Sequence, residues 1–236
     1  MLNATVLTEY VSAHPGELDA VVAKEAELLK KIHSTHFSHS ILPPMKDRIT
    51  REVRSGLADL FDEKALSEFE KAIAGMPDAD TMIHGDFQMR NIMIDKAGKL
   101  VLIDLGFACI GHPIFDLASM MPLTRVLHGI ATEREIAAVN GISSEEEFLQ
   151  VQQMNALAYR AWRKMLSIYF DETEEENLDN IEQRILVYSY ALYLCAFSVI
   201  LRGQREPLIR LTLKSLYDRF YDRRDEIGSL SEWWKV

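Results

Sequence analysis

The sequence is poor in cysteine and has no surplus of basic residues. Its 236 residues include two cysteines, Cys109 and Cys195, which form neither a CxxC pair nor a zinc-type spacing. We therefore expect no disulfide framework and predict a reduced, cytoplasmic protein. The 36 acidic residues outnumber the 26 basic ones, for a formal net charge of -10. A nucleic-acid partner is disfavoured because phosphate backbones require a basic surface, whereas a cationic small molecule is compatible.

Long apolar runs and targeting signals are also lacking. The N-terminus has no basic region followed by an apolar stretch, so no secretory signal is expected. The run 185–201 (ILVYSYALYLCAFSVIL) is uncharged over 17 residues, the lower edge of a membrane span. Its tyrosines and serines suit a protein interior better than lipid. We predict a buried core helix here and no membrane contact.

Apolar residues recur at helical spacing over most of the chain. The pattern predicts helices over 17–34, 45–56, 62–74, 114–127, 132–138, 144–169, 174–201 and 204–226. Short apolar or β-branched runs instead fill Thr81–His84, Ile92–Asp95 and Leu100–Asp104, and a tight connection at 96–98 joins the last two. The predicted fold is mainly α with a small β-hairpin. It divides into a helical region 1–80, a loop and hairpin 81–105, and a helical region 106–236.

Polar residues interrupt the predicted strands at three positions. Asp86 follows one strand, Asn91 precedes the next, and Asp104 ends the hairpin. A hairpin brings its ends together, so we expect Asn91 and Asp104 to face each other with Asp86 beside them. Amide and carboxylate oxygens suit Mg²⁺ that keeps other positions for phosphates and water. A second carboxylate can orient a hydroxyl and accept its proton.

The segment HGDFQMRNIMID…LVLIDLGFA…PIFDLA resembles the Brenner-type motif of aminoglycoside phosphotransferases, choline kinases and related small-molecule kinases. That pattern is HGDxxxxN, then an apolar strand ending in ID, then an acidic residue at a D-L-A-like helix start. The surrounding helices match as well, so the resemblance covers most of the chain. It implies the C-terminal lobe of a protein-kinase-like fold, with ATP and Mg²⁺ used to phosphorylate a hydroxyl of an aminoglycoside, choline or a similar small molecule.

The resemblance also implies roles for individual residues. Asp86 matches the catalytic base, and Asn91 and Asp104 match the Mg²⁺ ligands beside ATP. On residue type alone, Asp86 and Asn91 are also compatible with turn residues, and Asp104 with a strand-end acid.

The remaining motif positions have supporting roles in the resemblance. His84 and Gly85 match the structural start of the loop, and Asp116 matches a residue that braces the loop or caps its helix. Arg90 stands where the family usually has a small residue or glycine. It either contacts a phosphate of the nucleotide or faces solvent.

Two further groups of residues leave alternatives open. His33, His36 and His39 lie near a loop, but no carboxylate or cysteine completes a metal site there. Acidic residues gather where the family builds its acceptor pocket, and they either favour a cationic acceptor or form a solvated face. They are Glu172, Glu174, Glu175, Glu176 and Asp179.

The N-terminal β lobe that normally covers ATP is not recognisable. None of the 11 glycines falls in a GxGxxG, and no β-rich run with an interior lysine precedes residue 80. Thr5–Val11 is interpreted as a remnant of the strand joining the two lobes. The chain is then a fragment of a longer kinase, a natural single-lobe protein, or one lobe completed by a partner. An exposed nucleotide face predicts a homodimer or a partner chain.

Two other functions are compatible with the same residues. A catalytically inactive kinase-like module that binds or regulates would explain the missing lobe. A metal-dependent hydrolase using His84, Asp86 and Asp104 would require tight metal binding without nucleotide.

Overall fold

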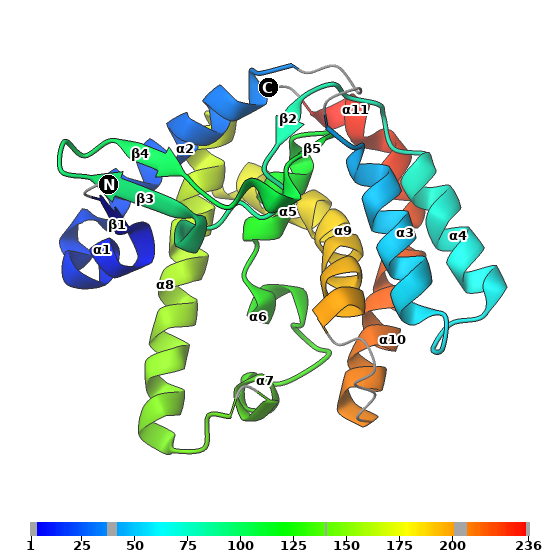
Figure 1. Ribbon diagram of the computed structural model, residues 1–236. Helices are drawn as coiled ribbons and strands as arrows, with labels where there is room; N and C mark the ends of the chain where they lie inside the picture. The colour runs from blue at the N-terminus through cyan, green and yellow to red at the C-terminus, as the bar shows by residue number, and fades with distance from the viewer. Residues whose placement is uncertain (1–3, 37–41, 140, 201–206, 235–236) are drawn as a thin grey trace. The chain divides into compact units, whose positions relative to one another are not determined.

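The computed structural model describes residues 4–36, 42–139, 141–200 and 207–234, and it is mainly helical with two small antiparallel sheets (Figure 1). The helices are α1 (Leu7–Ala13), α2 (Leu18–His33), α3 (Met45–Leu57), α4 (Glu63–Ala74), α5 (Ile114–Met120), α6 (Leu123–Val126), α7 (Glu133–Val139), α8 (Glu145–Phe170), α9 (Glu175–Ile200), α10 (Pro207–Asp222) and α11 (Leu230–Trp233). The strands are β1 (Ala4–Val6), β2 (Met82–Ile83), β3 (Ile92–Asp95), β4 (Leu100–Leu102) and β5 (Cys109–Ile110). His39, Leu201 and the first residues of the predicted helix 204–226 lie outside the described residues.

The predicted hairpin is present as β3 and β4. Ile92 pairs with Leu102 and Ile94 with Leu100. The turn closes because the Asp95 carboxylate accepts the backbone N–H groups of Ala97 and Lys99, at 2.8 and 2.9 Å. β1 joins the other edge of β3, so the sheet order is β1-β3-β4. β2 pairs separately with β5, an association that local sequence patterns did not indicate.

Two predicted elements need correction. Thr5–Val11 was expected to be a strand, but extended structure ends at Val6 and α1 follows. Leu7 and Val11, four residues apart, are both buried on one face of that helix, and this burial overrides the β preference of the β-branched residues. The predicted helix 114–127 is split into α5 and α6, because a proline at 122 disfavours helical geometry in the residue before it.

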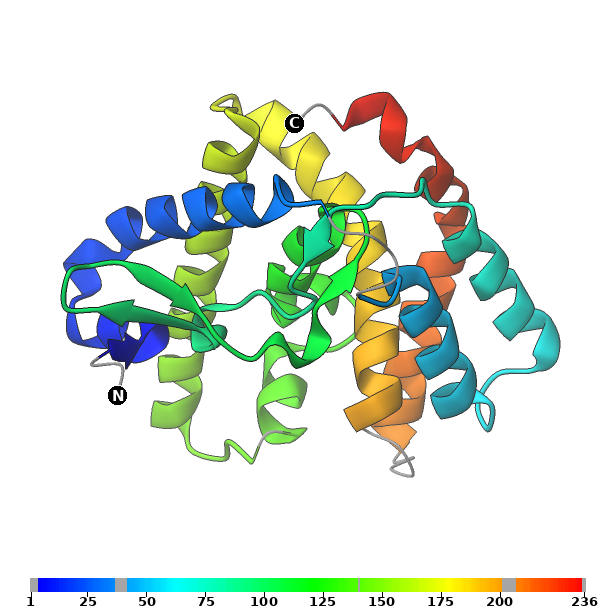
Figure 2. The same ribbon diagram turned by 45° about the horizontal axis from the view of Figure 1, so that its top comes forward.

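The chain forms two compact units. The first takes its residues from 1–45, 78–120 and 161–181, and it contains both sheets. In this unit α1 packs against β1 and β3, and α2 against β2 and β4 (Figure 2). The buried face of α2 is formed by Leu18, Val21, Val22, Glu25, Ala26, Leu29 and His33.

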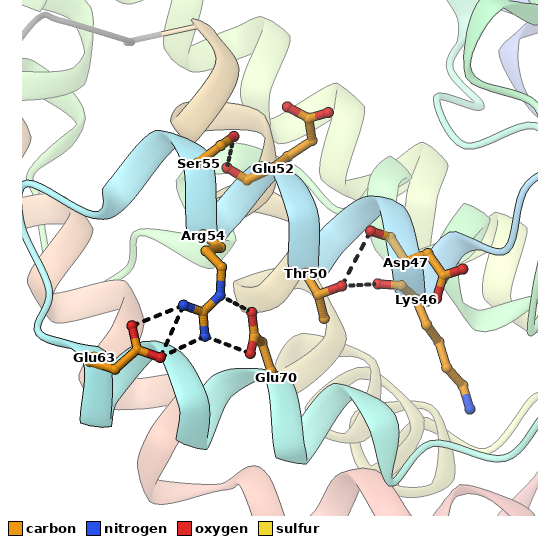
Figure 3. Close-up of polar contacts among 8 residues, drawn as sticks. All are labelled: Lys46, Asp47, Thr50, Glu52, Arg54, Ser55, Glu63 and Glu70. Atoms are coloured by element: carbon orange, nitrogen blue, oxygen red, sulfur yellow. Dashed lines mark hydrogen bonds and ion pairs between the residues drawn. The ribbon is translucent and has the colours of Figure 1, made fainter.

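The second unit takes its residues from 46–77, 121–160 and 182–236 and is helical. Gly56 of α3 lies against α9, where an added Cβ would meet the Ser198 carbonyl oxygen at 2.5 Å. Arg54 of α3 bridges Glu63 and Glu70 of α4, with N···O distances of 2.9 and 2.8 Å (Figure 3). These side chains are partly solvent-exposed, so the bridge adds little to the stability of the protein.

The apolar run of α9 lies largely inside the protein. Within the described residues, α9 alone has the length and hydropathy of a membrane span, and 56% of its most apolar stretch is buried. Ile185, Tyr188 and Leu194 are each at most 2% exposed. This burial agrees with the predicted core helix.

Candidate active site

The carboxylate of Asp116 supports the start of the loop that carries Asp86. This residue of α5 is 0% exposed, and its Oδ2 accepts the backbone N–H of His84 at 2.8 Å. Its Oδ1 accepts the backbone N–H of Gly85 at 2.7 Å. A buried carboxylate is stable only when hydrogen bonds satisfy it, so these contacts stabilise both Asp116 and the loop. The predicted bracing role agrees with this geometry.

A second support for Asp116 comes from α2. Nε2 of His33 lies 3.1 Å from Asp116 Oδ2, and Nδ1 of His33 lies 2.6 Å from the Tyr169 hydroxyl on α8. If Nε2 carries the proton of a neutral ring, the Tyr169 hydroxyl donates to Nδ1. Burial raises the pKa of Tyr169, which keeps that hydroxyl protonated. The sequence suggested His33 only as part of a metal site and did not single out Tyr169. The available signal was the position of His33 on the buried stripe of α2, four residues after Leu29.

Gly85 is required by the backbone at this point. Its φ is +78°, which favours glycine, and an added Cβ would lie 2.4 Å from the carbonyl oxygen of Phe107. The loop therefore approaches the segment after Asp104 more closely than a side chain permits.

His84 is buried and both of its ring nitrogens are engaged by the backbone. Nδ1 accepts the N–H of Asp86 at 3.3 Å, and Nε2 donates to the carbonyl of Ile103 at 3.0 Å. This histidine therefore joins the loop to the end of the hairpin. Nearby, burial lowers the pKa of His112 to about 4, so His112 is neutral at pH 7.

Three side chains surround the Asp86 carboxylate. Nδ2 of Asn91 donates to Asp86 Oδ2 at 2.9 Å, and Nε2 of Gln88 donates to Oδ1 at 2.8 Å. Nη2 of Arg90 lies 3.2 Å from Oδ2 and 3.3 Å from Oδ1. The structure thus brings Asp86, Asn91 and Arg90 together. Arg90 pairs with the carboxylate, a contact that neither sequence interpretation of Arg90 included.

Asp104 lies at the end of the hairpin, beside this group but outside its hydrogen bonds. The N–H of Ile103 donates to the carbonyl of Asn91 at 2.9 Å, which holds the two chain segments together. Asp104 is exposed and has a left-handed backbone, with φ 57° and ψ 62°. That conformation is rare outside glycine and asparagine-like residues, and it is often found at functional positions.

The side chains of Asn91 and Asp104 fit a hard cation. With its Nδ2 turned to Asp86, Asn91 keeps its amide oxygen for a ligand. Asp104 adds an exposed carboxylate. Oxygen donors of these two types suit Mg²⁺.

The histidines and acidic residues that the sequence suggested as further candidates have other partners in the structure. His33 contacts Asp116, and His36 lies 2.8 Å from Asp80. No cluster of three or more His, Cys, Asp or Glu ligands occurs within the described ranges. Of the acidic group, Glu175 and Asp179 pair with Arg163. Glu172 accepts the backbone N–H groups of Thr173 and Glu174 at the start of α9, and these bonds lower its pKa.

The fold is that of kinase-like phosphotransferases. The chain is similar to the crystal structure of ADP-bound aminoglycoside phosphotransferase APH(2'')-Ib, with a TM-score of 0.53 and 16% identity over 94% of this chain and 70% of that one. It is also similar to a choline/ethanolamine kinase family protein from Mesorhizobium loti, with a TM-score of 0.50 and 13% identity over 97% of this chain and 71% of that one. At these identities the likeness concerns the fold.

The family itself follows from the sequence. The model of the phosphotransferase enzyme family (APH) matches residues 2–150, and the chain belongs to this family. No curated protein matches it.

Proposed function

We propose that this chain is the C-terminal, catalytic lobe of a phosphotransferase that uses ATP and Mg²⁺ to phosphorylate a hydroxyl group of a small molecule. The observation that carries the proposal is the joined pair Asp86 and Asn91, in a loop whose first two amides are held by the buried Asp116. Phosphoryl transfer depends mainly on positioning and charge neutralisation, and a loop held by these hydrogen bonds supplies positioning.

Each residue has a distinct role in the proposal. Asp86 orients the acceptor hydroxyl and takes its proton as the new O–P bond forms and the bond to the leaving ADP breaks. Asn91 and Asp104 hold Mg²⁺, which neutralises phosphate charge when bound. His84 and Asp116 fix the loop. Arg90 leaves Asp86 and contacts a phosphate once nucleotide is present.

The nucleotide face carries exposed apolar side chains beside Asp104. Leu105 and Phe107 expose 53% and 41% of their surface. In the proposal this face is covered by a further β lobe, by a partner chain or by a second copy of this chain. We also predict a cytoplasmic location, because ATP is available there.

The acceptor is a small hydroxyl compound such as an aminoglycoside or choline. Glu174 and Glu176 are exposed acids at the start of α9 that would attract a cationic acceptor. The pairing of Glu175 and Asp179 with Arg163 leaves fewer free charges there, and it favours the reading of this region as a solvated face.

Calorimetric titration with ATP and Mg²⁺, followed by transfer assays with aminoglycosides and choline, tests the proposal. We expect binding that Asp104→Asn weakens about tenfold or more, and transfer that Asp86→Asn abolishes while ATP binding persists. Asp218→Asn, an exposed acid in α10, is the matched control. Binding unaffected by Asp104→Asn would contradict the assigned Mg²⁺ ligand.

A catalytically inactive binding or regulatory module is the second candidate. The observation that favours it is the Asp86 carboxylate, both of whose oxygens accept hydrogen bonds from neighbouring side chains. An occupied carboxylate is a poor proton acceptor until a donor leaves. No binding at millimolar ATP with Mg²⁺ would favour this module over the phosphotransferase.

A further inference from the structure

A buried tyrosine near the end of α8 begins a chain of hydrogen bonds that ends at the candidate active site. Tyr169 is 2% exposed, and its hydroxyl oxygen lies 2.6 Å from Nδ1 of His33. The other ring nitrogen of His33 lies 3.1 Å from Oδ2 of Asp116. Asp116 in turn accepts the first two amides of the loop that carries Asp86. Tyr169, His33 and Asp116 all belong to the first unit, so the chain lies within one compact body.

The direction of each hydrogen bond follows from the groups at its ends. A carboxylate only accepts, and Oδ2 of Asp116 already accepts an amide N–H, so Nε2 of His33 carries a proton and donates it. Burial and the negative charge of Asp116 raise the pKa of Tyr169, so its hydroxyl keeps a hydrogen to donate. An unprotonated Nδ1 is the acceptor that this hydrogen requires.

We propose that Tyr169 is a positioning residue for the catalytic loop. Its hydroxyl donates to Nδ1 of His33 and thereby keeps the imidazole neutral, with the single proton on Nε2 facing Asp116. The effect on catalysis rests on the proposed function, whereas the effect on the loop does not.

Loss of the Tyr169 hydroxyl would release the His33 ring. Nδ1 would lose its donor, so a half-turn of the imidazole or a shift of its proton to Nδ1 would no longer be opposed. Either change takes the N–H away from Asp116 and leaves that buried carboxylate with one donor fewer. The hold of Asp116 on the loop amides should weaken as a result.

A second buried tyrosine supplies the matched control. Tyr188 of α9 is also 2% exposed, and its hydroxyl donates to the carbonyl of Ile227 at 3.1 Å. Tyr188→Phe therefore removes the same atom and one buried hydrogen bond, but in the second unit and away from His33. An effect on the loop that exceeds that of Tyr188→Phe belongs to the chain of hydrogen bonds.

Nitrogen-15 NMR of the histidine side chains measures the form of the ring. The His33 signals are assigned by their loss in His33→Gln. At pH 7 we expect a neutral His33 with its proton on Nε2 in the wild type and in Tyr188→Phe, and loss of this single form in Tyr169→Phe. A wild-type ring protonated on both nitrogens, or on Nδ1 alone, would overturn the proposal.

Deuterium exchange at the amides of His84 and Gly85 measures the hold on the loop. After correction for the free energies of unfolding in urea, we expect exchange about fivefold or more faster in Tyr169→Phe than in Tyr188→Phe. In a His33→Gln background, which lacks Nδ1, Tyr169→Phe should change these rates by less than about twofold. Equal rates in the two tyrosine variants, or a full effect of Tyr169→Phe without His33, would reduce Tyr169 to a residue that only stabilises the fold.

Transfer kinetics test the catalytic consequence. Tyr169→Phe should lower kcat about threefold to tenfold and leave KM for ATP unchanged, because the alignment of Asp86 is affected and nucleotide binding is not. Tyr188→Phe should change neither constant. A chain without transfer activity would reject the proposed function alone, since the NMR and exchange measurements need no turnover. An active chain with unaltered kcat in Tyr169→Phe would overturn the positioning role.

Discussion

The carboxylate of Asp116 lies 3.1 Å from Nε2 of His33, although 83 residues separate the two in sequence. The same carboxylate holds the amides of His84 and Gly85. One buried acid thus ties the end of α2 and the start of α5 to the loop that carries Asp86. The position of Asp86 consequently depends on the core of the first unit.

Replacing Asp116 with Asn should destabilise the protein by about 3 kcal/mol, because the amide offers one acceptor oxygen to three buried donors. Urea unfolding monitored by circular dichroism measures the loss. Asp218→Asn, at an exposed position, should change the free energy of unfolding by less than about 0.5 kcal/mol. Equal stability of the two variants would show that Asp116 does not support the loop.

Gly85→Ala should cost more than backbone strain alone. The new Cβ would lie 2.4 Å from the Phe107 carbonyl, and φ is +78°. Gly141 has φ +79° with open space around it, so Gly141→Ala isolates the strain, about 1 kcal/mol. We expect Gly85→Ala to exceed that loss by about 1 kcal/mol or more in urea unfolding, because the contact is with backbone. Similar losses in both would argue against the close approach.

Glu25 predicts a pH dependence of stability. It is 1% exposed on the buried face of α2, its Oε1 has no hydrogen-bond partner, and burial raises its pKa from 4.5 to about 8. The folded chain therefore keeps a proton that the unfolded chain releases near pH 4.5. The resulting stabilisation is complete below pH 4.5 and is lost as pH rises through about 8, at up to about 1.4 kcal/mol per pH unit.

Glu25→Gln should remove this dependence. We expect the variant to gain on the order of 3 kcal/mol over the wild type at pH 8 relative to pH 5, measured as free energies of unfolding in urea. Glu27→Gln, an exposed position on the same helix, should leave the pH profile unchanged. Parallel profiles for Glu25→Gln and the wild type would mean that Glu25 reaches solvent or a partner.

A substitution of Arg90 distinguishes two roles for this residue, contact with a nucleotide phosphate and a purely structural pair with Asp86. If Arg90 contacts phosphate, Arg90→Gln should weaken ATP binding about threefold to tenfold and leave adenosine binding unchanged. Lys96→Gln, an exposed cation in the hairpin turn, should affect neither ligand. Calorimetric titrations with both ligands make the comparison, and unaltered ATP affinity would assign Arg90 to Asp86 alone.

Local patterns predicted the elements that depend on nearby residues. The strand at Ile92–Asp95 has the predicted bounds, because β-branched residues and the turn that Asp95 closes are all local. The bounds of α2 are close to those that its apolar spacing predicted. The loop residues Asp86 and Asn91 are hydrogen-bonded to each other, since five residues of chain limit how far they can separate. The expected facing of the Asn91 and Asp104 side chains stays a prediction.

Contacts between residues far apart in the sequence could not be predicted from local patterns. The pairing of β2 with β5 joins two-residue strands that carry almost no periodic signal. Tyr169 reaches His33 across 136 residues, and nothing local in either segment specifies the other. The contact of Arg90 with Asp86 depends on a side-chain rotamer, which sequence spacing leaves undecided.

The anchoring of His84 and Gly85 on Asp116 also sets how the loop exchanges with solvent. Their amide hydrogens are bound to a carboxylate that is itself enclosed, so deuterium can replace them only when the surrounding core opens. These two amides should therefore exchange as slowly as those of the central helices, which is unusual for a loop. Ligands would then meet a preformed surface and would not have to order it.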